Sequence, residues 1–148
     1  MVIGTDGSYA YNAPGGAGST AAGPGTPQEW QGSPDAVISR AINRYRLSQV
    51  GWQGFEALPW VKELHDRNPR LEDLATTCSA HDEARYTRDL ERLMAKSDKQ
   101  DGPAILAYFC SKLALEELSC RRMGAGSGMC DKRSAYMKIV GMLQEEIL

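Results

Sequence analysis

The chain has 148 residues, of which 42% are hydrophobic and 24% are charged, and its formal net charge is -2. This size predicts one ordinary globular domain, and the slightly acidic balance excludes a protein that coats nucleic acid through a uniformly basic surface. No apolar run approaches the ~18 residues that span a bilayer, and the N-terminus lacks the regions of a secretory signal. We therefore expect a cytoplasmic protein that does not contact a membrane.

Residues 1–33 form a predicted flexible arm. Residues 1–34 hold 8 of the 15 glycines and 4 of the 7 prolines, and they contain no Lys or Arg. Ordering glycine costs the most backbone entropy, and this stretch offers little apolar area to offset that cost. A disordered tail is the favoured interpretation. The alternative is an arm that orders on a partner through Tyr9, Tyr11 and Trp30.

Helical signals begin at Ser33, a predicted N-cap, followed by Pro34 at the first helical position. This first helix is expected to end near Gly51, where an irregular link begins. Its apolar residues recur at helical spacing: Val37, Ile38, Ala41, Ile42 and Tyr45. Pro59 then opens a short helical pattern, which the Asn-Pro pair at 68–69 closes.

The segment from Ser79 to Asp82 has the form of a capping box, with Asp in place of the usual Glu or Gln. The helix that it predicts has an apolar face formed by Tyr86, Leu90, Leu93 and Met94. After a polar loop, Pro103 starts a strongly apolar helix. Because no sustained period-2 pattern occurs, we expect an all-α protein, a small helical bundle in which residues 34–148 form one helical domain.

The C-terminal part divides into three predicted pieces: a buried helix over 103–111, a second helix over 112–124 and, after a Gly-rich link, a third helix that starts at Asp131. The motifs in these pieces are an aromatic helix, then Leu-x-Leu-Glu-Glu-Leu, then Met-Gly, and finally a capped helix. Their order resembles the helix-turn-helix of sigma-factor region 4. It also resembles the C-terminal half of phage late-gene antitermination proteins of the Q type. The resemblance covers about residues 81–148 and implies a helix-turn-helix at 103–148.

Local chemistry agrees with this assignment. Gly124 stands where a left-handed residue ends a helix, and Asp131 can cap the last helix and suits its positive end. The link between these two residues is longer than a standard tight turn. The supporting helix has an apolar side formed by Leu115, Leu118 and Met123. The inward stripe of the last helix is formed by Ala135, Ile139, Met142 and Ile147, with Leu143 beside it.

The resemblance implies that the last helix lies in the major groove of DNA, with its N-terminal residues at the base edges. Residues 119–140 contain five basic side chains against Asp131 alone, a local charge of +4. Five such contacts on one face would give salt-dependent attraction to a duplex, and Arg can bind guanine through two hydrogen bonds. The predicted DNA-binding residues are Arg121, Arg122, Lys132, Arg133, Tyr136 and Lys138. The alternative interpretation is solvated surface charge on a helical bundle.

By resemblance, the protein is a phage transcription antitermination factor that acts in the cytoplasm of a bacterial host. Such a factor binds double-stranded DNA near a promoter, engages paused bacterial RNA polymerase or its sigma subunit, and suppresses pausing and termination. It catalyses no reaction and needs no cofactor. Two alternatives stay open. One is a simple helix-turn-helix repressor, activator or terminase-like DNA-binding subunit, and the other is a helical protein–protein adaptor that does not bind DNA.

Neither a metal site nor a catalytic site is predicted. The four cysteines lack the closely spaced pairs that structural zinc uses, and we expect reduced thiols at Cys78, Cys110, Cys120 and Cys130. No P-loop lysine follows the Gly-rich stretch at 124–128. Glu116 and Glu117 are adjacent and diverge by about 100° on a helix, so we expect them to face solvent rather than to act as an acid/base pair.

Overall fold

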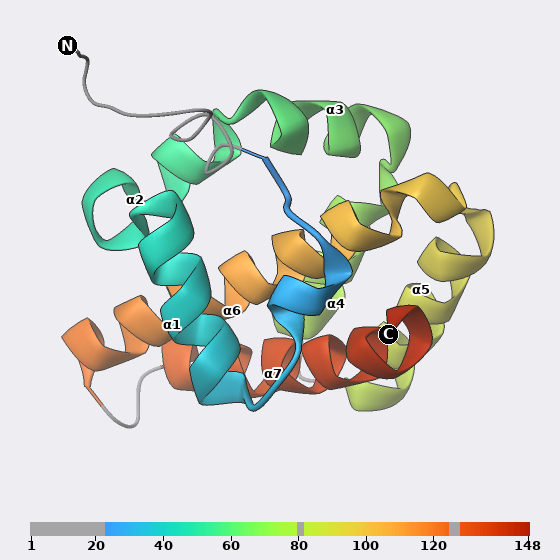
Figure 1. The fold of residues 1–148 in the computed structure, drawn as a ribbon. Coiled ribbons are helices and arrows are strands. Elements are labelled where there is room, and N and C mark those ends of the chain that lie inside the picture. The colour runs from blue at the N-terminus through green and yellow to red at the C-terminus, as the bar shows by residue number, and fades with distance from the viewer. Residues whose placement is uncertain (1–22, 80–81, 125–127) are drawn as a thin grey trace, which may run out of the picture.

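The computed structural model describes residues 23–79, 82–124 and 128–148, and within these ranges it contains seven α-helices, two short 3-10 helices and no strand (Figure 1). In chain order the elements are η2 (Pro27–Trp30), α1 (Pro34–Tyr45), α2 (Leu47–Glu56), α3 (Pro59–Arg67), α4 (Arg70–Ser79), α5 (Glu83–Lys96), η3 (Lys99–Asp101), α6 (Gly102–Met123) and α7 (Gly128–Ile147). The predicted all-α fold is confirmed.

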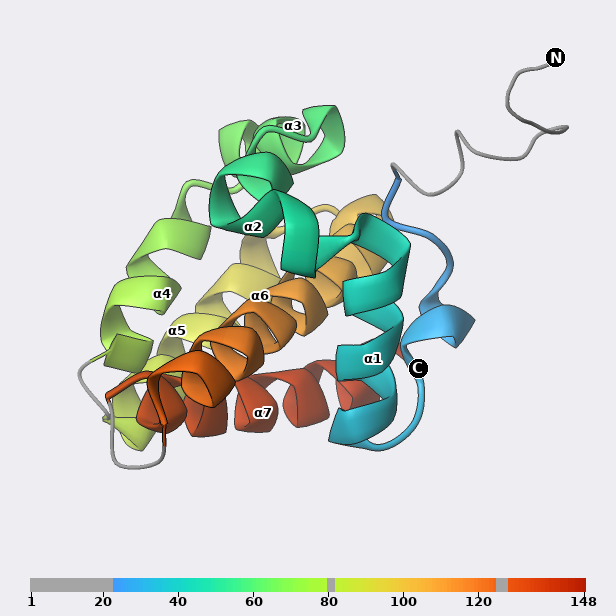
Figure 2. The same cartoon turned by 90° about the vertical axis from the view of Figure 1, so that its left-hand side faces the viewer.

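α6 is the central helix, and most of the other elements pack around it (Figures 1 and 2). Residues 105–116 of α6 are all buried, as expected for a helix that is apolar on nearly every side. The prediction of separate helices over 103–111 and 112–124 is wrong, because no Gly or Pro interrupts the segment and it forms one helix of 22 residues. α7 runs beside α6 in the opposite direction (Figures 1 and 2).

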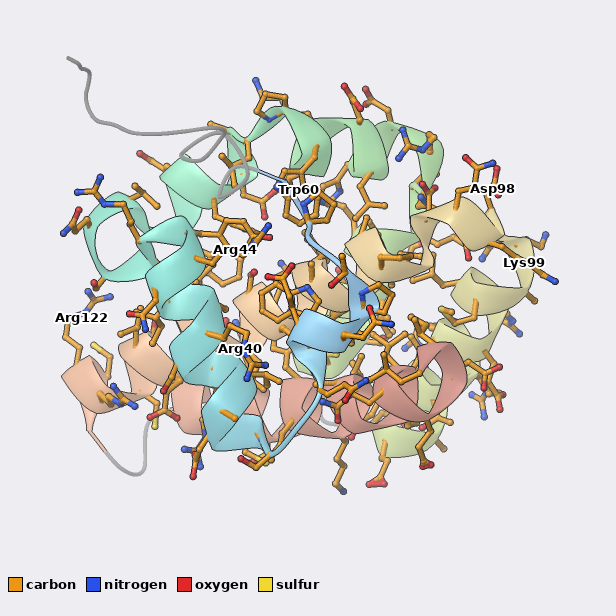
Figure 3. All side chains as sticks on the ribbon, in the orientation of Figure 1. Arg40, Arg44, Trp60, Asp98, Lys99 and Arg122 are labelled. Atoms are coloured by element: carbon orange, nitrogen blue, oxygen red, sulfur yellow. The ribbon has the colours of Figure 1, made fainter. Side chains whose placement is uncertain are left out.

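The N-terminal side of the fold begins earlier than predicted. Trp30 in η2 has no exposed surface, and its indole Nε1 donates a 2.9 Å hydrogen bond to the carbonyl of Pro24. Arg40 of α1 donates to the carbonyls of Glu29 and Gln31 and lies between α1 and the η2 segment (Figure 3). The predicted boundary of the flexible arm at residue 33 is therefore too late in the chain, since Trp30 already belongs to the folded core. Residues 1–22, with both predicted partner-binding tyrosines, lie outside the described residues.

α1 and α3 begin where they are predicted to begin, and α3 also ends at the predicted Asn-Pro pair. Ser33 caps α1 by accepting the amide of Ala36. That helix ends at Tyr45 rather than near residue 51, because Arg46 adopts a left-handed backbone with φ of 53°. α2 follows at once and contains a kink at Gly51.

α5 keeps its predicted apolar face, since Tyr86, Leu90 and Leu93 are buried. The predicted N-cap at Ser79 is wrong. Ser79 ends α4, whereas the carboxylate of Asp82 accepts the amide of Arg85 and so caps α5.

Candidate nucleic-acid interface

The end of α6 and the start of α7 meet at a short connection. Gly124 ends α6, with its amide bonded to the carbonyl of Cys120 and a φ of 88° that favours glycine. α7 begins at Gly128, three residues before Asp131, so the prediction that Asp131 caps this helix is wrong. The connection at 124–127 therefore has four residues, a length typical of helix-turn-helix units. Its two helices lie side by side, however, whereas those of that motif meet at about 90–120°.

Four of the six predicted DNA-binding residues gather at this junction. We call Arg121, Arg122, Lys132 and Arg133 the junction cations. Arg121 and Arg122 are exposed in the last turn of α6, and Lys132 and Arg133 are half-buried in the first turns of α7. Figure 3 shows Arg122 at the outer end of α6, at the edge of the molecule. The structure thus places two of these cations at the end of α6 and two near the start of α7.

Glu117 holds two of the junction cations. Its Oε2 accepts Nε of Arg121 at 2.7 Å, and its Oε1 accepts Nη1 of Arg133 at 2.8 Å. These hydrogen bonds, that of Arg133 first, keep the pKa of Glu117 below its usual value. Arg122 and Lys132 form no ion pair with any residue in the described ranges. The junction thus contains two cations anchored by Glu117 and two that form no described ion pair. Of these two, Arg122 is exposed, and the charge of Lys132 partly offsets the rise that burial causes in the pKa of Glu116.

The prediction that Tyr136 faces outward is wrong. Its side chain is only 3% exposed and packs against Phe109 of α6, with ring centroids 6.2 Å apart. The buried face of α7 is wider than the predicted stripe and includes Tyr136 and Val140. Tyr136 cannot reach a duplex in this position. Met123, predicted to be on the apolar side of α6, is 64% exposed instead.

Lys138 does not belong to the junction. Its ammonium group donates to a carboxylate oxygen of Glu83, which starts α5. This exposed ion pair links α7 to α5 and raises the pKa of Lys138. The sixth predicted contact therefore lies on a different part of α7 from Lys132.

Two charged side chains of α6, those of Lys112 and Glu116, are buried in the core, and sequence reasoning missed both. The ammonium nitrogen of Lys112 lies 4.4 Å from the ring centroid of Trp52, 5.3 Å from that of Tyr108 and 5.9 Å from that of Tyr136. Burial lowers the pKa of Lys112. One turn further, Glu116 is buried, its Oε2 has no hydrogen-bond partner in the described ranges, and burial raises its pKa. The expectation that Glu116 faces solvent is wrong, because it lies in the stretch of α6 over 105–116 in which every residue is buried.

The cysteines differ from one another in state. Cys78 and Cys110 are free and buried, and burial raises the pKa of each thiol to about 12. Such thiols are poor nucleophiles at neutral pH. Cys120 is disulfide-bonded, so the expectation of a reduced thiol is wrong for this residue. Within the described ranges, no group of three or more His, Cys, Asp or Glu side chains could hold a metal ion.

Comparison of the chain with protein-family models, with curated proteins and with solved structures finds no match. None of the helices in the described part of the chain has the combined length and apolar character needed to cross a membrane.

The pair of glutamates in α6 predicts two opposite effects on stability. The pKa of Glu117 is lower in the folded protein than the ordinary 4.5, so its stabilisation is complete above the unfolded pKa and is lost as the pH falls through the folded pKa. Glu117→Gln is therefore expected to lower the free energy of unfolding at pH 7 and to weaken the acid dependence below about pH 5. Urea unfolding as a function of pH measures both changes.

Glu116→Gln is the matched control, because the pKa of Glu116 is raised instead. The cost of burying its charge is present above the folded pKa and disappears as the pH falls through it. Glu116→Gln is thus expected to stabilise the protein at pH 7. A shift of the same sign in both variants would contradict the opposite environments of the two carboxylates.

Proposed function

We propose that this protein binds double-stranded DNA through the junction cations, as a regulator of transcription of the Q antitermination type. The observation that carries the proposal is the pair Arg122 and Lys132, which come from two helices and form no ion pair in the described ranges. An Arg at the end of α6 and a Lys near the start of α7, neither of them in a described salt bridge, suit the closely spaced phosphates of a duplex.

The two cations that Glu117 anchors, Arg121 and Arg133, support DNA binding because they fix the position of α7 relative to α6. Glu117 fixes Arg133 against α6, so the first turns of α7 are held at a defined place relative to Arg122. The N-terminal end of a helix also carries a partial positive charge that favours phosphate. Because the inner face of α7 is buried on α6, the contact uses the junction and the outer face of α7 rather than a projecting recognition helix.

The DNA-binding step is tested by removing only the two cations that form no ion pair. Arg122→Ala/Lys132→Ala is expected to weaken binding to a phage late-promoter duplex. It should also reduce the slope of log K against log salt by about one for each phosphate that the protein no longer neutralises. Fluorescence anisotropy over a salt series measures both quantities.

Lys62→Ala/Arg70→Ala is the matched control, with one exposed Lys on α3 and one exposed Arg on α4. It removes the same charge from another part of the surface and is expected to leave the affinity unchanged. Equal losses of affinity in both double variants would show that only net charge matters and would contradict a DNA site at the junction.

The regulatory step needs a separate readout. An antitermination factor is expected to increase read-through of a terminator by RNA polymerase when the template carries the factor's DNA site. A repressor, an activator or a terminase-like subunit would bind the same duplex without this effect. In-vitro transcription with wild type and with Arg122→Ala/Lys132→Ala separates these functions.

A further inference from the structure

A groove lies at the other end of the α6–α7 pair, between α5 and the C-terminal half of α7, with η3 and the start of α6 closing one end. Its volume is about 960 Å³. The apolar lining comes from Leu90, Met94, Pro103, Met142, Leu143 and Ile147. Leu90 and Leu143 are buried in its floor, whereas Met94, Met142 and Ile147 are half-buried. The groove therefore offers an apolar strip that no described part of the chain covers.

Acidic side chains surround this strip. The lining includes Glu91, Asp98, Glu145 and Glu146, and Lys99 is the basic residue among those that line it. None of the four acids forms an ion pair within the described part of the chain. Figure 3 shows Asp98 and Lys99 at the outer edge of the molecule. Four carboxylates outside any ion pair, against one ammonium group, give the rim a negative potential.

We propose that this groove binds an amphipathic helical segment of a partner protein, with apolar residues on one face and Lys or Arg on both flanks. A helix that inserts its i, i+3, i+4 and i+7 side chains is a common occupant of such grooves. The half-buried Met94 and Met142 suit the binding of such a helix, because their flexible thioether side chains adapt to the shape of its apolar face. The four acids then pair with the basic flanks, which gives specificity and a faster encounter.

This inference does not depend on DNA binding. The groove contains the start of α6 and the end of α7, whereas the junction cations occupy the end of α6 and the start of α7. The 22 residues of α6 span ~33 Å at ~1.5 Å per residue. The two surfaces are therefore far enough apart for both to be occupied at once.

The probe is a fluorescein-labelled model helix of roughly 18 residues, with Leu at i, i+3, i+4 and i+7 and Lys on both flanks. Wild type is expected to bind it with micromolar affinity. Glu145→Lys/Glu146→Lys reverses two exposed rim charges and is expected to weaken binding by roughly tenfold. Asp66→Lys/Asp73→Lys reverses two exposed acids on α3 and α4 and is expected to leave it unchanged. Thermal unfolding confirms that each variant is folded.

Three outcomes overturn the proposal. The first is no binding of the Lys-flanked helix to wild type, and the second is equal binding of the same helix with Glu flanks. The third is self-association of wild type in sedimentation experiments that Glu145→Lys/Glu146→Lys abolishes, because the groove would then hold a second copy of this chain. Failure of the junction variants to change DNA binding affects none of these readouts, so the two proposals fail separately.

Discussion

Trp30→Ala is expected to lower the free energy of unfolding by about 3–5 kcal/mol. The indole has no exposed surface and stacks on Tyr45, with ring centroids 6.3 Å apart. Truncation leaves a cavity between η2 and α1 and also removes the hydrogen bond from Nε1 to the carbonyl of Pro24. At roughly 2–4 °C per kcal/mol, the midpoint of thermal unfolding should fall by about 10 °C.

Two Trp→Phe substitutions separate the packing of the ring from its hydrogen bond. Trp30→Phe removes an N–H group that has a partner and is expected to cost about 1 kcal/mol more than Trp60→Phe. The buried Nε1 of Trp60 has no hydrogen-bond partner among the described residues, so losing it leaves none of them unsatisfied. Urea unfolding compares the two variants. A loss below about 1 kcal/mol for Trp30→Ala would mean that η2 is not part of the folded core.

Three helix starts could be predicted because their signals are local, whereas those of α5 and α7 could not. Ser33 with Pro34, Pro59 and Pro103 each mark a helix start within one residue of the observed one. The burial of Trp30 could not be predicted in this way, because its backbone carbonyl accepts a hydrogen bond from the side-chain Nε2 of Gln144, 114 residues away. The Gly- and Pro-rich composition therefore predicts a flexible arm up to residue 33, although a distant residue, Gln144, contacts the described part of it at Trp30.

Contacts between residues that are far apart in the sequence also limit what could be predicted of the candidate site. Sequence order places two cations before a turn and two after it, so their meeting at the junction follows from a helical hairpin alone. The pairing of Glu117 with Arg133 depends on the relative rotation of α6 and α7, which one sequence does not reveal. The cage around Lys112 needs rings from α2 and α7 as well as α6. Only the unusual Lys within an apolar helix could have drawn attention to it.

The α6–α7 pair has opposite charge at its two ends. Arg122 and Lys132 lie at one end, and Glu145 and Glu146 lie at the other. A net charge of -2 conceals this separation. The arrangement suits a protein that holds a polyanion at its basic end while a basic partner segment occupies its acidic end. The basic end repels the partner segment, and the acidic end repels the polyanion.

The second large effect is expected for Tyr136→Ala, which should lower the free energy of unfolding by about 3–5 kcal/mol. The ring fills the space between α7 and Phe109, and it covers the ammonium group of Lys112. Removing it creates a cavity and also takes one aromatic face from a buried cation. Urea unfolding at pH 7 measures the loss of stability.

Tyr136→Phe keeps the ring and distinguishes a core residue from a DNA contact. The hydroxyl of Tyr136 has no hydrogen-bond partner in the described part of the chain, so this variant is expected to keep its stability within about 1 kcal/mol. Its affinity for the promoter duplex should also equal that of wild type, because the ring faces α6. If Tyr136→Phe instead weakened DNA binding without a change in stability, the hydroxyl would have to reach the duplex. The outer face of α7 would then have to include Tyr136, and the burial of its ring against Phe109 would be wrong.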